Sequence, residues 1–282
     1  MNFFGEIVLP VVLFMVMLGI GFGTKITAFK YLIYSPKVTL IGVFSQIFLL
    51  PIIALVLGLF FSEEIAAGLF LLSLCPSGTG SNLITKMVSG NVELSIVLTT
   101  LSSFLSLILM PLGMQFVLSE TIVNTQLINE FDSLTVVGQI SLFVVLPVLI
   151  GTLIGEWNRA FVEKLKAMLK WLLPTLLFGV FFLIWIYDEP KSEHLSVGDF
   201  LLPVLLINLL SMLLSFLFSK LNKLSTKDAL SISIEAGLKN SGIGLLLVTS
   251  MSQGTFTLLM LAYSFTSFYV TLALGALLKR FG

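Results

Sequence analysis

The sequence predicts an all-α membrane protein with nine transmembrane helices, and three observations favour this class. Hydrophobic residues make up 57% of the 282-residue chain and charged residues only 11%, whereas a soluble domain carries roughly 25% charged residues. The apolar residues gather in nine stretches, each close to the roughly 20 residues that span a bilayer. The basic residues fall almost entirely in alternate connections between these stretches, as the positive-inside rule describes.

The nine predicted spans are too long and too continuously apolar for membrane β-strands. They cover residues 5–23, 38–60, 65–88, 92–117, 135–155, 171–187, 200–219, 229–251 and 255–278. The first lacks the basic flank and cleavage site of a signal peptide, so we interpret it as a retained span. With nine spans, 13 of the 15 Lys and Arg residues lie on one side. We therefore expect an external N-terminus, a cytoplasmic C-terminus and a single polytopic unit.

The composition also excludes several classes of function. Lys and Arg together number 15, as do Asp and Glu, so no net positive field exists to attract nucleic acid. One Cys and one His exclude an internal disulfide and a Cys- or His-based metal site. No Asp lies in the middle of a predicted span, and the only His falls in an acidic loop, so an intramembrane protease is not expected. We predict that the chain is not an enzyme.

Two of the predicted spans are interrupted by polar, glycine-containing segments. The third contains Pro76, Gly78 and Gly80, and the eighth contains Gly237 and Gly242. Proline removes a backbone donor and breaks the helical ladder, and polar groups at this depth must face protein or a wet cavity. The two spans lie five apart in order, so they cross the membrane in opposite directions, as inverted repeats require. Paired broken helices are the best sequence pointer to a transporter binding site, although glycine and proline also kink helices that merely pack closely.

Each break exposes a new helix N-terminus, where free N–H groups and the helix dipole favour an anion. The freed carbonyls on the other side of each break favour a cation. Ionisable residues inside a span are expensive and are functional candidates by default, and the eighth span holds Glu235 and Lys239. At i,i+4 spacing they could form a structural ion pair. Alternatively, Glu235 binds a cation and Lys239 is an internal counter-charge.

Hard cations such as Na⁺ prefer oxygen ligands, and several polar side chains in other spans could supply them. These candidate ligands are Gln46, Ser81, Asn82, Ser95 and Thr99. A single Ser or Thr in a membrane helix usually bonds to its own backbone. The prediction of a cation site therefore depends on the convergence of these residues with Glu235.

The same residues carry a resemblance to a known family. Two segments resemble the two signatures of the bile acid:sodium symporter family. The first signature is similar to Cys75-Pro76-x-Gly-Thr-x-Ser-Asn followed by Gly90-Asn91-Val92-x-Leu94-Ser95-x-x-x-Thr99, and the second to Ser233-Ile234-Glu235-x-Gly237-x-x-Asn240-Ser241-Gly242. Gln46 and Pro51 in the second span are similar to the family as well. The resemblance extends over essentially the whole chain with the spacing preserved. It implies a core domain at about 38–118 and 200–278, with the broken helices crossing at its centre. It also implies a panel domain at about 5–23 and 135–187.

The resemblance further implies sodium-coupled inward transport of an organic anion, with one or two Na⁺ ions. By motif position, one sodium site would use Ser81, Asn82, Ser95, Thr99 and Glu235. The second would use Gln46, Glu235, carbonyls near residues 236 and 238, and the side chain at 239. The substrate would approach the crossover at Thr79, Gly80, Asn240 and Ser241.

The sequence departs from the family at position 239, where Gln is usual and this chain has Lys. An ammonium group has only donors and cannot ligate Na⁺. We therefore predict that Lys239 occupies the second sodium site as a fixed positive charge, or contacts the substrate anion directly. Proton-coupled anion transport and cation/proton antiport remain alternatives, since the antiport architecture often has a buried acid–lysine pair. We expect a monomer in the bacterial inner membrane, whose partners are lipid and a small organic anion.

Overall fold

The computed structural model describes residues 3–24, 30–78, 80–119, 133–187, 197–250 and 254–281. These residues form helices and connections, and they contain no strand beyond one isolated bridge between Ser77 and Lys239. Six helical stretches in this part of the chain are long and apolar enough to cross a membrane. They are Phe4–Gly23, Pro36–Gly58, Val92–Phe116, Leu134–Trp157, Gly198–Leu221 and Thr255–Arg280. The prediction of an all-α membrane protein is confirmed.

Three of the long stretches contain a wider, π-helical turn, and a proline follows each turn by two residues. The turns are η1 (Phe4–Val8), η3 (Ser45–Leu49) and η4 (Ser141–Val145), which precede Pro10, Pro51 and Pro147. Proline has no backbone N–H and its ring clashes with the carbonyl one turn earlier, so the ladder widens there. The helices resume as α1 (Leu9–Gly23), α4 (Leu50–Gly58) and α9 (Leu146–Trp157).

Both predicted interruptions are present. The third predicted span is divided into α5 (Glu63–Leu74) and α6 (Ser81–Met87), and the eighth into α12 (Thr226–Gly237) and α13 (Ser241–Ser250). Cys75 is extended (φ −59°, ψ 144°), as the residue before a proline prefers to be. Leu238, which follows α12, is also extended (φ −107°, ψ 98°). A serine N-cap precedes the first half of each broken helix. Ser62 Oγ accepts from the N–H of Ile65 at the start of α5, and Ser225 Oγ accepts from the N–H of Asp228 at the start of α12.

The remaining elements connect and surround these broken helices. They are α2 (Lys30–Tyr34), α3 (Pro36–Phe44), α7 (Val92–Ser119), α8 (Ser133–Ile140), α10 (Arg159–Tyr187), η5 (Val197–Phe200), α11 (Leu201–Leu221) and α14 (Gly254–Phe281). The helix expected at 171–187 is the apolar end of the longer α10, whose first half carries basic residues and continues the helix outside the apolar run.

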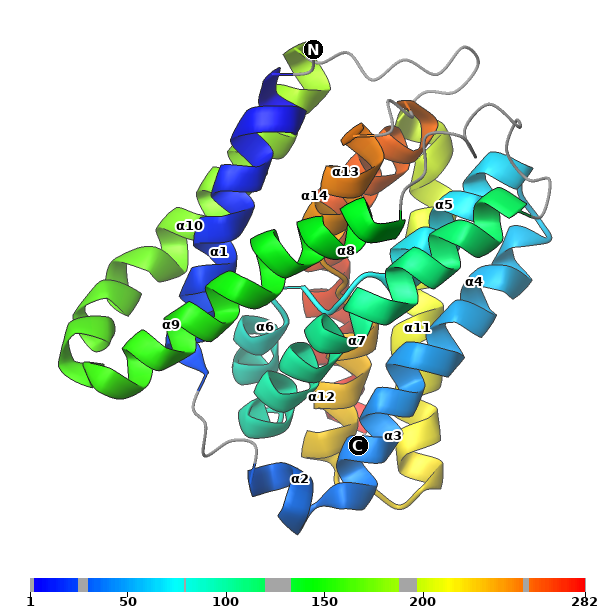
Figure 1. Cartoon of the computed structure of the whole chain (residues 1–282). Coiled ribbons are helices and arrows are strands. Elements are labelled where there is room, and N and C mark those ends of the chain that lie inside the picture. Colours follow the sequence, from blue (N-terminus) through cyan, green and yellow to red (C-terminus); the bar gives the residue numbers. More distant parts are fainter. Residues whose placement is uncertain are drawn as a thin grey trace.

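The helices divide into two sides in Figure 1. The helices α1, α9 and α10 lie together on one side, α4, α5 and α11 lie on the other, and α12 to α14 run between them. On the first side α1 and α9 approach closely at Gly21 and Gly151, where an added Cβ on Gly21 would lie 2.4 Å from the Val148 carbonyl oxygen. Small residues permit such contacts between membrane helices.

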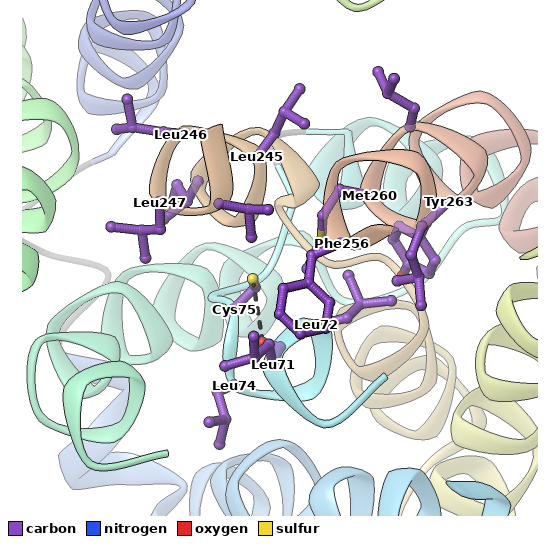
Figure 2. Close-up of a cluster of buried hydrophobic side chains, with 14 of the residues drawn as sticks. Leu71, Leu72, Leu74, Cys75, Leu245, Leu246, Leu247, Phe256, Met260 and Tyr263 are labelled. Carbon is purple, nitrogen blue, oxygen red and sulfur yellow. Dashed lines mark hydrogen bonds between the residues drawn. The ribbon is translucent and has the colours of Figure 1, made fainter. Parts of the chain in front are cut away.

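A cluster of buried apolar side chains packs one face of the two breaks. Figure 2 shows Leu72 and Cys75 at the end of α5 against Leu245 of α13 and Met260 of α14. Cys75 is buried with its thiol directed at the Leu71 carbonyl, which agrees with a packing role for this residue.

Candidate ion and substrate site

The two breaks cross and bond to each other through their backbones. The N–H of Gly78 donates to the Leu238 carbonyl at 2.7 Å, and the N–H of Asn240 donates to the Pro76 carbonyl at 2.8 Å. These bonds form the antiparallel bridge between Ser77 and Lys239. Backbone groups freed from a helix inside a membrane must find partners within the protein. Each break supplies the partners that the other lacks.

Gly78 allows the two backbones to come this close. A Cβ atom at this position would lie 3.1 Å from the carbonyl oxygen of Lys239 and 3.3 Å from that of Leu238. Backbone oxygens in a bonded bridge have little room to move away. Glycine at position 78 therefore avoids a tight contact between a side chain and the backbone of the second break.

The Glu235 carboxylate lies at the crossover and is fully buried among hydroxyl groups. Ser95 Oγ donates to its Oε1 atom, and Thr99 Oγ1 lies 2.8 Å from its Oε2 atom. Ser81 Oγ is 3.4 Å from Thr99 Oγ1, and Asn82 Oδ1 is 2.8 Å from Ser95 Oγ. The helices α6, α7 and α12 thus bring together all five residues predicted for the first cation site.

Two hydroxyls of this cluster each lie within hydrogen-bonding distance of two oxygen acceptors. The single hydroxyl hydrogen of Ser95 faces both the Glu235 carboxylate and Asn82 Oδ1. That of Thr99 faces both the carboxylate and the Ser95 carbonyl, which is 2.9 Å away. A hydroxyl has one hydrogen to donate, so each of these two hydroxyls can bond only one of its two acceptors at a time. The oxygen atoms that converge here are also the ligands that a hard monovalent cation prefers.

Gln46 lies beside this cluster on the π-helical turn η3. Its Oε1 atom is 2.8 Å from Ser77 Oγ, which is also 3.0 Å from the Glu235 carbonyl, while Gln46 Nε2 is buried with no hydrogen-bond partner among the described residues. With the amide rotated by 180°, Nε2 would donate to Ser77 and Ser77 to the carbonyl, leaving Oε1 free as a ligand. Gln46 thus lies one hydroxyl away from the backbone carbonyl of Glu235, and its role as a cation ligand stays a prediction.

Ser77 and Ser102 belong to this region, and the sequence analysis did not identify them. The Ser77 hydroxyl joins Gln46 to Glu235, and Ser102 Oγ accepts from the Ser77 N–H at 3.1 Å. The position of Ser77, directly after Pro76 in the break, was a signal that could have pointed to it. Ser102 had no such signal, because it is one of several serines along α7.

Lys239 is 5% exposed but does not contact Glu235. The helix α12 ends at Gly237 and Leu238 is extended, so the i,i+4 geometry needed for a helical ion pair is lost. No ion pair joins the two side chains in the described part of the chain, where the carboxylate accepts from Ser95 and Thr99. The structural ion-pair alternative is therefore wrong. Lys239 instead lines a small cavity together with Asn208 and Tyr263.

Tyr263 and Asn208 hold the second break in place, and both were missed by the sequence analysis. Tyr263 is buried on α14, where its hydroxyl accepts from the Lys239 N–H at 2.9 Å and donates to the Gly237 carbonyl. Asn208 Nδ2 on α11 donates to the same carbonyl at 2.7 Å. The carbonyl freed at the end of α12 is thus bonded to two side chains from neighbouring helices.

Three of the four predicted substrate residues can be located. Gly80 precedes the first turn of α6, Asn240 is 4% exposed, and Ser241 Oγ is 2.7 Å from Ser264 Oγ. Asn240 Nδ2 also lies 4.0 Å from the sulfur of Met17 on α1. Asn240 therefore meets α1, whereas Gly80 lies against Leu238 and Phe268. Thr79 lies outside the described residues.

Comparisons with known proteins find relatives whose names are those of transporters. The chain is 30% identical over 240 residues to a Bacillus subtilis protein named "uncharacterized sodium-dependent transporter YocS", covering 83% of this chain and 71% of that protein. It is 27% identical over 266 residues to a chloroplastic protein of Oryza sativa named "probable sodium/metabolite cotransporter BASS2", covering 92% and 59%. It is 29% identical over 249 residues to the hepatic sodium/bile acid cotransporter of Rattus norvegicus, covering 83% and 65%. The chain thus spans less than two thirds of the rice and rat proteins.

A family model described as the sodium bile acid symporter family matches residues 10–189. This match confirms the predicted resemblance over more than half of the chain. The family description and the names of these relatives are those of transporters, which supports the prediction that the chain is a transporter rather than an enzyme. On the matched residues and the similarity to YocS, the chain belongs to the sodium bile acid symporter family.

Proposed function

We propose that the protein is a sodium-coupled symporter of a small organic anion that works by alternating access. The single observation that carries this proposal is the convergence of side-chain oxygens on the buried Glu235 carboxylate, at the crossing of two broken helices. The names of the relatives support sodium as the coupling ion. Ser81, Asn82, Ser95 and Thr99 are the proposed side-chain ligands that accompany Glu235 in the first sodium site, and Gln46 belongs to the proposed second site.

In the proposed mechanism Na⁺ binds first and neutralises Glu235. Its ligands come from α6, α7 and α12, so the ion draws together both broken helices and orders the crossover. The anion then docks near Thr79, Gly80, Asn240 and Ser241, where the positive end of the α13 helix dipole favours negative charge. Movement of one group of helices against the other would next expose the loaded site to the opposite side.

The proposed architecture has nine crossings. They are the six long apolar stretches, the two broken helices and α10. The helices at 38–118 and 200–278 would form the core and those at 5–23 and 135–187 the panel, a division supported by the packing of α1 against α9 and α10. With this count the basic residues face the cytoplasm, which gives an external N-terminus in a bacterial inner membrane. The monomer would be the working unit.

Lys239 is proposed to act as a built-in cation that replaces the second sodium ion. It occupies the position of an oxygen ligand, and its ammonium cannot coordinate a metal ion. Coupling would then use one Na⁺ per transport cycle. Proton coupling, or cation/proton antiport that uses Glu235 and Lys239, is the alternative favoured by the presence of two ionisable groups at the crossover.

Sodium binding can be tested before the anion is identified. The purified protein should melt at a higher temperature in NaCl than in choline chloride at equal ionic strength, because a ligand stabilises the state that it binds. Proteoliposomes should then take up a labelled organic anion when Na⁺ is outside and fail to do so with choline. Uptake that follows a proton gradient and ignores Na⁺ would instead establish the alternative.

A further inference from the structure

The cavity beside Lys239 contains a polar atom that the proposed sodium site does not use. Asn208 is 1% exposed, and its Oδ1 atom is buried without a hydrogen-bond partner among the described residues. Its orientation is fixed, because Nδ2 donates to the Gly237 carbonyl at 2.7 Å and to Thr271 Oγ1 at 3.1 Å. Rotation of the amide would place two carbonyl oxygens together. Oδ1 is therefore an acceptor that lacks a donor.

An unsatisfied buried acceptor costs roughly 1–3 kcal/mol, so a donor is expected nearby. Lys239 lines the same cavity and carries three hydrogens on its ammonium. Ser73 and Ser211 also line it, and each already donates its hydrogen to a backbone carbonyl, to Phe70 at 2.6 Å and to Asn208 at 2.9 Å. Their hydroxyl oxygens can therefore only accept. The cavity is thus rich in acceptors and has one cationic donor.

We propose that Asn208 is the positioning residue for Lys239, and that its carboxamide oxygen holds the ammonium through one buried water. The cavity has room for about one water molecule, and no direct hydrogen bond joins the two side chains among those that the structure describes. This arrangement keeps the ammonium on the α11 side of the crossover. Glu235, on the α7 side, is then left with its hydroxyl partners and remains available for a cation.

The inference rests on the proposed role of Lys239 as a built-in cation and names the residues that hold that cation. It explains how a lysine and a glutamate four positions apart can lie at one crossover without pairing with each other. Asn208 also bonds to Gly237, so its substitution has a structural effect as well. The test must distinguish the effect of losing the carboxamide oxygen from the effect of losing the carboxamide nitrogen.

A double-mutant cycle on the purified full-length protein makes this separation and needs no transport measurement. The decrease in melting temperature caused by Asn208→Leu should be roughly twice as large in the wild-type background as in the Lys239→Met background. Only the wild-type background has an ammonium group that loses its acceptor. Thr271→Val is the matched control, because it removes a partner of Nδ2 and leaves Oδ1 in place. Its effect should be the same in both backgrounds.

Asn208→Asp keeps the test decisive if the leucine variant does not fold. It loses the donor to the Gly237 carbonyl in both backgrounds, so only the difference between backgrounds is compared: the new carboxylate should lower the melting temperature less beside Lys239 than in the Lys239→Met background, where a buried charge has no partner. Equal effects of both Asn208 variants in the two backgrounds would overturn the assignment. Because sodium-dependent uptake by the wild type is measured separately, failure of the cycle leaves the symport proposal standing, and failure of uptake leaves the cycle interpretable.

Discussion

In both breaks, backbone groups that leave the helix are hydrogen-bonded by the other break and by a neighbouring helix, but the two breaks differ in the side chains at the bridge. At the bridge, the N–H of Ser77 is bonded by Ser102 from α7, and the N–H of Lys239 is bonded by Tyr263 from α14. The first break places a small hydroxyl at its bridged position and the second places a long cation. The backbone is thus nearly symmetric across the crossover, whereas its charge is not, and this asymmetry is where we expect ion coupling to be determined.

Removal of the charge at the crossover should have the largest effect. Glu235→Gln is expected to weaken Na⁺ binding by roughly 100-fold, because hydrogen bonds and ion contacts to a buried charge contribute about 1.5–3 kcal/mol. The sodium-dependent shift in melting temperature should disappear and uptake should fall with it. Glu93→Gln, at an exposed position near the start of α7, is the control and should behave as wild type. A Glu235→Gln protein that keeps the sodium shift would remove Glu235 from the site.

Restoring an oxygen ligand at position 239 should make the second break behave as a cation site. Lys239→Gln is expected to raise the Hill coefficient for Na⁺ from about one to about two, because an amide oxygen can coordinate an ion and an ammonium cannot. Initial uptake rates against Na⁺ concentration measure this change. The exposed Lys279→Gln on α14 should leave the coefficient unaltered. A wild-type coefficient near two would contradict the proposal that Lys239 replaces an ion.

The close approach of the two backbones predicts a stability effect in the first break. Gly78→Ala should lower the free energy of unfolding by about 1–3 kcal/mol, since the added methyl group meets the carbonyl oxygens of Leu238 and Lys239. Gly179→Ala on α10 is the matched control, because nothing lies within 4 Å of its Cβ position and alanine favours a helix interior. Thermal unfolding in detergent compares the two. Equal stability of both variants would mean that the breaks separate readily.

The sequence predicted the long apolar helices and both breaks because hydrophobic length, proline and glycine act locally. It also predicted which residues surround Glu235, since their polar side chains had no satisfactory partner in lipid. It did not predict Tyr263, Asn208 or Ser102, which bond to backbone groups of other helices and are ordinary residues within their own segments. The sequence also did not predict where the Lys239 side chain lies. The i,i+4 spacing favours an ion pair with Glu235 only if the helix continues, and the structure lacks this pair because Leu238 is extended.

The smallest expected effect compares the two side chains that bond to the bridged N–H groups. Ser102→Ala removes one hydrogen bond at the first break and should lower the free energy of unfolding by about 1 kcal/mol. Tyr263→Phe removes two bonds at the second, to Lys239 and to Gly237, and should cost about 2 kcal/mol because Asn208 still bonds to the Gly237 carbonyl. Denaturant unfolding of both variants measures the ratio. If Ser102→Ala were the more damaging change, the first break would depend on its hydroxyl more than the second depends on its phenol, and the near-symmetry of the crossover would not hold energetically.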